Sequence, residues 1–160
     1  QHNNSEAINA CFVMSSLINV CLNQNVSKKE FTQEIGKLLD NKFLFLKLKE
    51  FEDYVSSEFY NPEWDLIPPG ALVTLLAVLY SVYNNFDSFE SAIFAGLSLG
   101  GDTDSVAALI GALMGTRLGI GKIPEKWINI PCDSHFGGYK ELMELSKKFS
   151  EFIENFETNF

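Results

Sequence analysis

Apolar residues recur at intervals of three and four positions along most of the chain, and no stretch alternates strictly between apolar and polar residues. The first spacing is typical of amphipathic helices, whereas strict alternation is typical of half-buried strands. The pattern therefore predicts an all-α fold. It indicates helices over residues 5–22, 43–59, 103–118 and 139–156, together with helices that begin after Ser27, Pro69, Asp87 and Pro124.

The first expected helix carries an apolar stripe with helical spacing. A stripe of this kind normally faces the core of a globular protein, so we expect it to be the buried side of the helix. The stripe consists of Ile8, Cys11, Phe12, Ser15, Ile18 and Leu22.

Two short segments have the spacing of a helix start. Ser27-Lys-Lys-Glu30 matches a capping box, in which the serine and glutamate side chains each accept a hydrogen bond from an amide that the helix leaves unpaired. Asp87-Ser-Phe-Glu90 has a similar pattern. We therefore expect Asp87 to cap the helix that follows it.

The helix after Pro69 is the most hydrophobic of the chain, and we expect it at the centre of a bundle. The glycine pair Gly100-Gly101 is expected to end the next helix. The helix after this pair has a narrow side of small residues, where another helix backbone can approach closely. That side consists of Ala107, Ala108, Gly111, Ala112 and Gly115.

Composition narrows the class of protein. The chain has 160 residues, of which 46% are hydrophobic, enough for one globular domain with a buried core. Its net charge of −9 opposes binding to nucleic-acid backbones or anionic membranes, so we expect neither as a partner. The longest apolar stretch, residues 71–83, is shorter than the ~20 residues that a membrane-spanning helix needs.

Cysteine usage and the start of the chain bear on where the protein works. Cys11, Cys21 and Cys132 are an odd number without close pairing, which fits reduced thiols. No signal peptide is evident, so we expect a cytoplasmic location. The chain begins with Gln1 rather than methionine, and we expect it to be a piece of a longer protein.

Candidate chemistry is concentrated in the segment Gly100-Gly-Asp-Thr-Asp-Ser105. Asp102 and Asp104 stand two residues apart, with hydroxyl groups at Thr103 and Ser105. This places several hard oxygen ligands of the kind that Mg²⁺ prefers at one turn. The alternative is that an aspartate at a helix start merely caps the helix. The residues alone leave both interpretations open.

This segment resembles the signature of the ADP-ribosylglycohydrolase family, which is Gly-Gly-Asp-Thr-Asp-Thr before an Ala- and Gly-rich helix, followed by Ile-Pro-x-x-Trp. The chain has the acidic segment, then residues 106–115 rich in Ala and Gly, then Ile123-Pro-Glu-Lys-Trp127, in the same order. The opening Gln1-His2 and its helix are similar to the family's Thr-His segment. The resemblance implies an all-α, orthogonal multi-helix bundle.

The resemblance also implies a magnesium-dependent hydrolase of ADP-ribosyl glycosidic linkages, acting on ADP-ribosylated proteins or related ADP-ribose compounds. In that family two aspartates and the following hydroxyl residue hold a pair of Mg²⁺ ions, and the matching residues are Asp102, Asp104 and Ser105. The two aspartates are therefore the catalytic candidates. The candidates for contacting the substrate are His2, Gly100 and Gly101.

The family's first half contains a Thr-Asp-Asp-Thr metal motif, which does not occur in this chain. We therefore expect residues 1–160 to be the C-terminal part of one ADP-ribosylglycohydrolase domain, carrying about half of the active site and inactive by itself. Two alternatives stay open. One is a non-catalytic relative of the same fold, crystallin-like or ADP-ribose-binding, and the other is a helical interaction module whose aspartates only cap a helix.

Overall fold

The structure is a computed structural model that describes residues 4–23, 25–38, 41–57, 60, 70–128 and 138–157. These residues form eight α-helices and one 3₁₀ helix, with no strand among them, so the predicted all-α class is confirmed. The chain divides into two compact units, Gln1–Ile123 and Pro124–Phe160, and each is described by itself.

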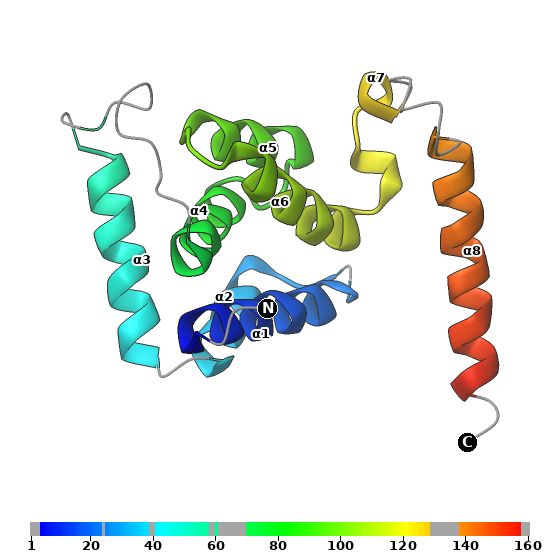
Figure 1. The fold of residues 1–160 in the computed structure, drawn as a ribbon, viewed down its shortest axis with the longest axis horizontal. Helices are drawn as coiled ribbons and strands as arrows, with labels where there is room; N and C mark the ends of the chain where they lie inside the picture. Colours follow the sequence, from blue (N-terminus) through cyan, green and yellow to red (C-terminus); the bar gives the residue numbers. More distant parts are fainter. Residues whose placement is uncertain are drawn as a thin grey trace. The chain divides into compact units, whose positions relative to one another are not determined.

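The first unit contains six of the α-helices and the 3₁₀ helix (Figure 1). They are α1 (Ser5–Cys21), α2 (Lys28–Leu38), α3 (Asn41–Val55), α4 (Ala71–Asn84), α5 (Phe89–Ser98), α6 (Thr103–Leu118) and η1 (Ile120–Lys122). Helix α4 packs against α1, α3, α5 and α6. Its side chains at Val78, Leu79 and Val82 are fully buried, which confirms the expected central position.

The buried side of α1 differs from the predicted stripe. The side chains that α1 buries are Ala10, Val13, Met14, Leu17 and Cys21. By contrast Ile8 and Phe12 are each 56% exposed and Leu22 is 66% exposed, so the predicted stripe is wrong. Apolar residues surround α1 and leave it with a single charged residue, Glu6, so periodicity could not identify which side packs.

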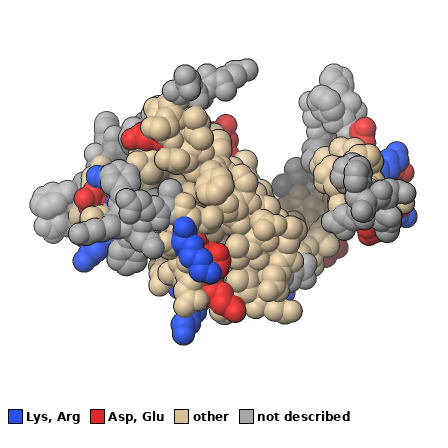
Figure 2. All heavy atoms as spheres, turned by 90° about the horizontal axis from the view of Figure 1, so that it is seen from below, with Lys and Arg blue, Asp and Glu red and all other residues tan. Residues whose placement is uncertain are grey.

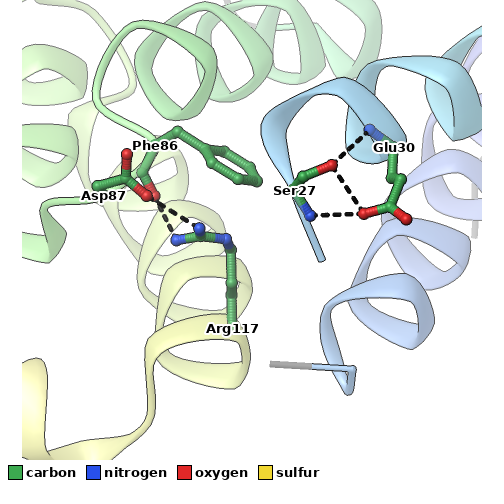
Figure 3. A network of polar contacts seen from close by, with 5 residues as sticks. All are labelled: Ser27, Glu30, Phe86, Asp87 and Arg117. Carbon is green, nitrogen blue, oxygen red and sulfur yellow. Dashed lines mark hydrogen bonds and ion pairs between the residues drawn. The ribbon is translucent and has the colours of Figure 1, made fainter. Parts of the chain in front are cut away.

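The capping box at the start of α2 forms as predicted (Figure 3). The Ser27 amide donates to the Glu30 carboxylate at 2.8 Å, and the Glu30 amide donates to Ser27 Oγ at 3.2 Å. These bonds from the Ser27 amide and hydroxyl lower the pKa of Glu30.

At α5 the predicted cap is wrong by one residue. Ser88 is the N-cap and accepts a hydrogen bond from the Ser91 amide at 3.2 Å. Asp87 instead forms an ion pair with Arg117, whose guanidinium is buried and also donates to the carbonyl of Phe86. The Arg117 guanidinium lies 3.7 Å from the centre of the Phe86 ring (Figure 3). A buried cation therefore ties the end of α6 to the turn between α4 and α5.

Helices α5 and α6 pack closely, but at a different glycine from those predicted. A Cβ atom on Gly96 of α5 would lie 2.4 Å from Ile110 Cδ1 of α6, whereas one on Gly111 or Gly115 would meet nothing closer than 3.9 Å. Ala108 and Ala112, also predicted to line this contact, are exposed. The glycine that the packing requires is thus Gly96.

The second unit contains α7 (Glu125–Ile128) and α8 (Gly138–Glu157). The predicted short helix after Pro124 and the long final helix are both confirmed. Helix α8 has an apolar side formed by Leu142, Leu145, Phe149 and Phe152, all exposed. Over the residues that the structure describes, no helix combines the length and apolar character needed to span a membrane.

Candidate functional site

The candidate site begins at the turn that joins α5 to α6. Gly100 and Gly101 have φ values of 69° and 73°, a left-handed conformation that other residues rarely adopt. The pair ends α5 as predicted, and α6 starts two residues after Gly101. The Tyr60 hydroxyl donates to the carbonyl of Leu99, so a side chain distant in sequence anchors the last residue before the glycines.

Asp102 occupies the N-cap position of α6, yet its side chain makes no capping hydrogen bond. The backbone carbonyl of Asp102 instead accepts the first bond of the helix, from the Val106 amide at 3.1 Å. The Asp102 carboxylate therefore does not cap α6 in the structure. Asp102 is half-buried.

Asp104 and Ser105 are both exposed in the first turn of α6. Hydrogen bonding with the Asp102 side chain lowers the pKa of Asp104 most, and the backbone amides of Asp104 and Ser105 lower it further. Carboxylates are among the hard oxygen ligands that Mg²⁺ and Ca²⁺ bind.

A cavity of about 560 Å³ lies beside this turn. Its polar lining comes from three helices and the residue before α1, while apolar side chains of α1, α4 and α6 form the rest. The polar side chains are Asn4, Glu6, Thr74, Asp102 and Ser105. Among the described residues that line the cavity, Asp104, Gly100 and Gly101 do not appear.

The sequence interpretation missed Glu6 and its neighbour Asn4. Asn4 caps α1 by accepting a hydrogen bond from the Glu6 amide at 2.8 Å, which fixes the first turn of the helix at the cavity wall. Glu6 adds a second carboxylate to the cavity that Asp102 also lines. A signal was available, because Glu6 is the single charged residue of a 17-residue helix.

The acidic turn fits part of a magnesium site. Asp102, Asp104 and Ser105 offer adjacent hard oxygens on the first turn of a helix. Within the described part of the chain, however, no group of three or more His, Cys, Asp or Glu residues is placed to hold a metal ion. This chain would therefore hold a cation together with water or with ligands that the described residues do not include. His2 lies outside the described residues, so its proposed contact with the substrate stays a prediction.

Comparisons with known proteins point to one family. The model of the family described as ADP-ribosylglycohydrolase matches residues 1–157. The ADP-ribosylarginine hydrolase Tri1 of Pseudomonas putida (strain GB-1) is 28% identical over 131 residues, which are 79% of this chain and 32% of the relative. Tri1 of Serratia proteamaculans (strain 568) is 27% identical over 124 residues, covering 78% of this chain and 32% of the relative.

A shorter match involves the ADP-ribosylhydrolase ARH3 of Homo sapiens, 40% identical over 42 residues, which are 26% of this chain and 12% of the relative. No solved structure matches the chain. The chain spans about a third of the length of the Tri1 proteins that match most of it.

Proposed function

Because this chain belongs to the ADP-ribosylglycohydrolase family, we propose that it is part of a magnesium-dependent enzyme that hydrolyses ADP-ribosyl glycosidic linkages. The observation that carries the proposal is the acidic turn itself, whose Asp102 and Ser105 line a cavity of about 560 Å³. This volume lies within the range of about 300–1,000 Å³ that is usual for small-molecule sites. Two free cysteines, Cys11 and Cys21, support the cytoplasm as its compartment.

Each residue of the turn has a distinct task in this proposal. Asp102 and Ser105 present oxygen ligands from the cavity wall, and Asp104 adds an ionised carboxylate beside them. Gly100 and Gly101 lack side chains, so a substrate can approach the backbone where α5 ends. A bound divalent cation supplies a Lewis acid that orients oxygen ligands and favours the ionisation of water.

We further propose that the 160 residues do not turn over substrate alone. Mg²⁺ demands near-octahedral coordination and gives up its water shell reluctantly, so a few adjacent ligands bind it weakly. The described residues offer no third acidic, histidine or cysteine ligand close to Asp102 and Asp104. Weak binding of the cation and of ADP-ribose, without turnover, is the expected behaviour of this chain.

The linkage to test first is ADP-ribosylarginine. The two Tri1 relatives, which match more than three quarters of the chain, are named ADP-ribosylarginine hydrolases, whereas the ARH3 matches cover 26% to 40% of it. We propose ADP-ribosylated proteins as the substrate class, with a modified arginine as the leading candidate.

Calorimetry with ADP-ribose tests the proposal on the chain as it stands. We expect ADP-ribose to bind only weakly unless Mg²⁺ is present. Asp102→Asn should lower the affinity at least about tenfold, because losing even an outer-shell partner of a metal site costs about 10–100-fold. Asp53→Asn is the matched control, because it removes the same charge from an exposed position on α3. Binding that is equally strong without Mg²⁺ and in Asp102→Asn would overturn the magnesium-dependent site and favour a non-catalytic helical protein.

A further inference from the structure

The outer side of helix α1 lacks the charged residues that a surface helix normally carries. Its 17 residues include no Lys or Arg and one acidic residue, Glu6, at the first turn. One side packs against α2, α4 and α6 through the buried residues named above. The opposite side, which we call the outer face of α1, consists of Ile8, Cys11, Phe12, Ser15, Asn19 and Leu22, spaced by three and four residues and all exposed.

A surface helix normally carries charged and polar residues opposite its buried side, as α8 does. On the outer face of α1, by contrast, the exposed apolar side chains of Ile8, Phe12 and Leu22 lie among the uncharged Ser15 and Asn19. Figure 2 views the first unit from the side on which α1 and α2 lie in Figure 1, and a broad area there carries no Lys, Arg, Asp or Glu side chain. Isolated exposed apolar residues need no explanation, but large apolar side chains exposed together, such as Ile8 and Phe12 one helical turn apart, are typical of an interface.

The length of the chain indicates what covers this face. The chain spans about a third of the Tri1 relatives, so two thirds of such a protein has no counterpart in these residues. The outer face is also continuous with the candidate site, because Cys11 belongs to this face and lines the cavity that Asp102 and Ser105 line. A segment seated on Ile8 and Phe12 would therefore border the cavity.

We propose that the outer face of α1 is the docking surface for helices equivalent to the part of the Tri1 relatives that this chain does not span. Docking there buries Ile8, Cys11 and Phe12 and brings further side chains to the cavity beside Asp102. The arrival of further side chains at the cavity rests on the proposed function, whereas the docking on the outer face of α1 does not.

Cys11 provides a native probe of this docking. It is exposed on the outer face, whereas Cys21 is fully buried and burial raises its pKa to about 11. A maleimide therefore labels Cys11 and spares Cys21 near neutral pH. Cys132→Ser in every variant removes the third thiol, so the labelling rate reports on the outer face of α1.

The experiment compares the 160-residue chain with a fusion in which the uncovered two thirds of the Pseudomonas putida relative is joined to it. Fusion supplies a high effective concentration, so a modest affinity suffices for docking. We expect the fusion to label at Cys11 at least about tenfold more slowly than the isolated chain, as for a site that opens only transiently. Equal rates in the two proteins would overturn the proposal.

Paired variants locate the contact. Phe12→Glu should return the labelling rate of the fusion to that of the isolated chain, because it places a charge in the proposed interface. Phe94→Glu is the matched control, since Phe94 on α5 is 51% exposed and lies outside the outer face, and it should leave Cys11 protected. Both variants should leave the melting temperature of the isolated chain unchanged, since neither side chain is buried.

Other outcomes distinguish other occupants and the proposed function. If light scattering finds the isolated chain dimeric with Cys11 already protected, and Phe12→Glu makes it monomeric, a second copy covers the face and the proposal is wrong. If Cys11 is protected in the fusion but ADP-ribosylarginine is not hydrolysed, docking stands and the proposed function fails. If ADP-ribosylarginine is hydrolysed while Cys11 stays unprotected, the proposed function stands and the docking proposal is wrong.

Discussion

Gly96→Ala is expected to destabilise the protein through a single clash in the α5–α6 contact. The new Cβ atom would lie 2.4 Å from Ile110 Cδ1 and 3.0 Å from Val106 Cγ1. Ile110 is fully buried and Val106 is 2% exposed, so both side chains can yield only by repacking within the core. Overpacking of this kind costs about 1–3 kcal/mol.

The net effect is smaller than the clash, because alanine is a better helix former than glycine by about 1 kcal/mol. Gly111→Ala is the matched control. It receives the same propensity gain in the neighbouring helix, but its Cβ would meet Ile93 Cδ1 at an ordinary 3.9 Å. The free energies of unfolding of the two variants should therefore differ by about 1–3 kcal/mol, with Gly96→Ala the less stable.

Thermal unfolding followed by circular dichroism measures this difference. One kcal/mol corresponds to about 2–4 °C in a chain of this size, so the two melting temperatures should differ by about 2–12 °C. The contact also fixes the turn that follows α5, so Gly96→Ala should weaken Mg²⁺-dependent ADP-ribose binding more than Gly111→Ala does. Equal melting temperatures, or a more stable Gly96→Ala, would show that the contact of Gly96 with Ile110 does not limit the packing of α5 against α6.

Three further predictions follow from individual residues. Arg117→Ala should lower the free energy of unfolding by about 3 kcal/mol, because it removes a buried group with three partners. Asp87→Asn should lower it by less than about 1 kcal/mol, because the Asp87 side chain is 89% exposed. Denaturant titration compares the two variants, and equal losses of stability would contradict the central role of Arg117 in this contact. The pKa of Glu30 is lowered in the folded state from its ordinary 4.5, so its stabilising effect is present above pH 4.5 and is lost as the pH falls through the lowered value. Glu30→Gln should therefore make the melting temperature less sensitive to acid below pH 4.5. An unchanged pH profile of the melting temperature would count against the capping box. Gly101→Ala should cost about 1–2 kcal/mol because its φ is 73°, and a melting temperature equal to that of the unaltered chain would show that the left-handed conformation is not required.

Helix positions and the acidic turn could be predicted from the sequence because both depend on local information. Spacing of three and four, a capping box at Ser27 and a glycine pair at Gly100 each act within a few residues. The predicted positions of the helices therefore agree closely with those in the structure. Asp102 and Ser105 lie together for the same reason, since they belong to one turn of one helix.

The misassigned residues depend on contacts between distant segments. Phe12 was expected to be buried and is exposed, because the packed side of α1 is chosen by α2, α4 and α6 and not by its own sequence. Asp87 was expected to cap α5 but pairs with Arg117, thirty residues away. Glu6 was missed because only the fold brings the start of α1 to the cavity that Asp102 lines.

If the turn between α5 and α6 holds a divalent cation, as we propose, paramagnetic broadening by Mn²⁺ should locate the ion there. In the isotope-labelled chain, we expect the amide signals of Asp102, Asp104 and Ser105 to broaden first and to recover when Mg²⁺ is added in excess. The double variant Asp102→Asn/Asp104→Asn should abolish this broadening. Broadening that is strongest at acidic residues elsewhere, or that persists in the double variant, would contradict the claim.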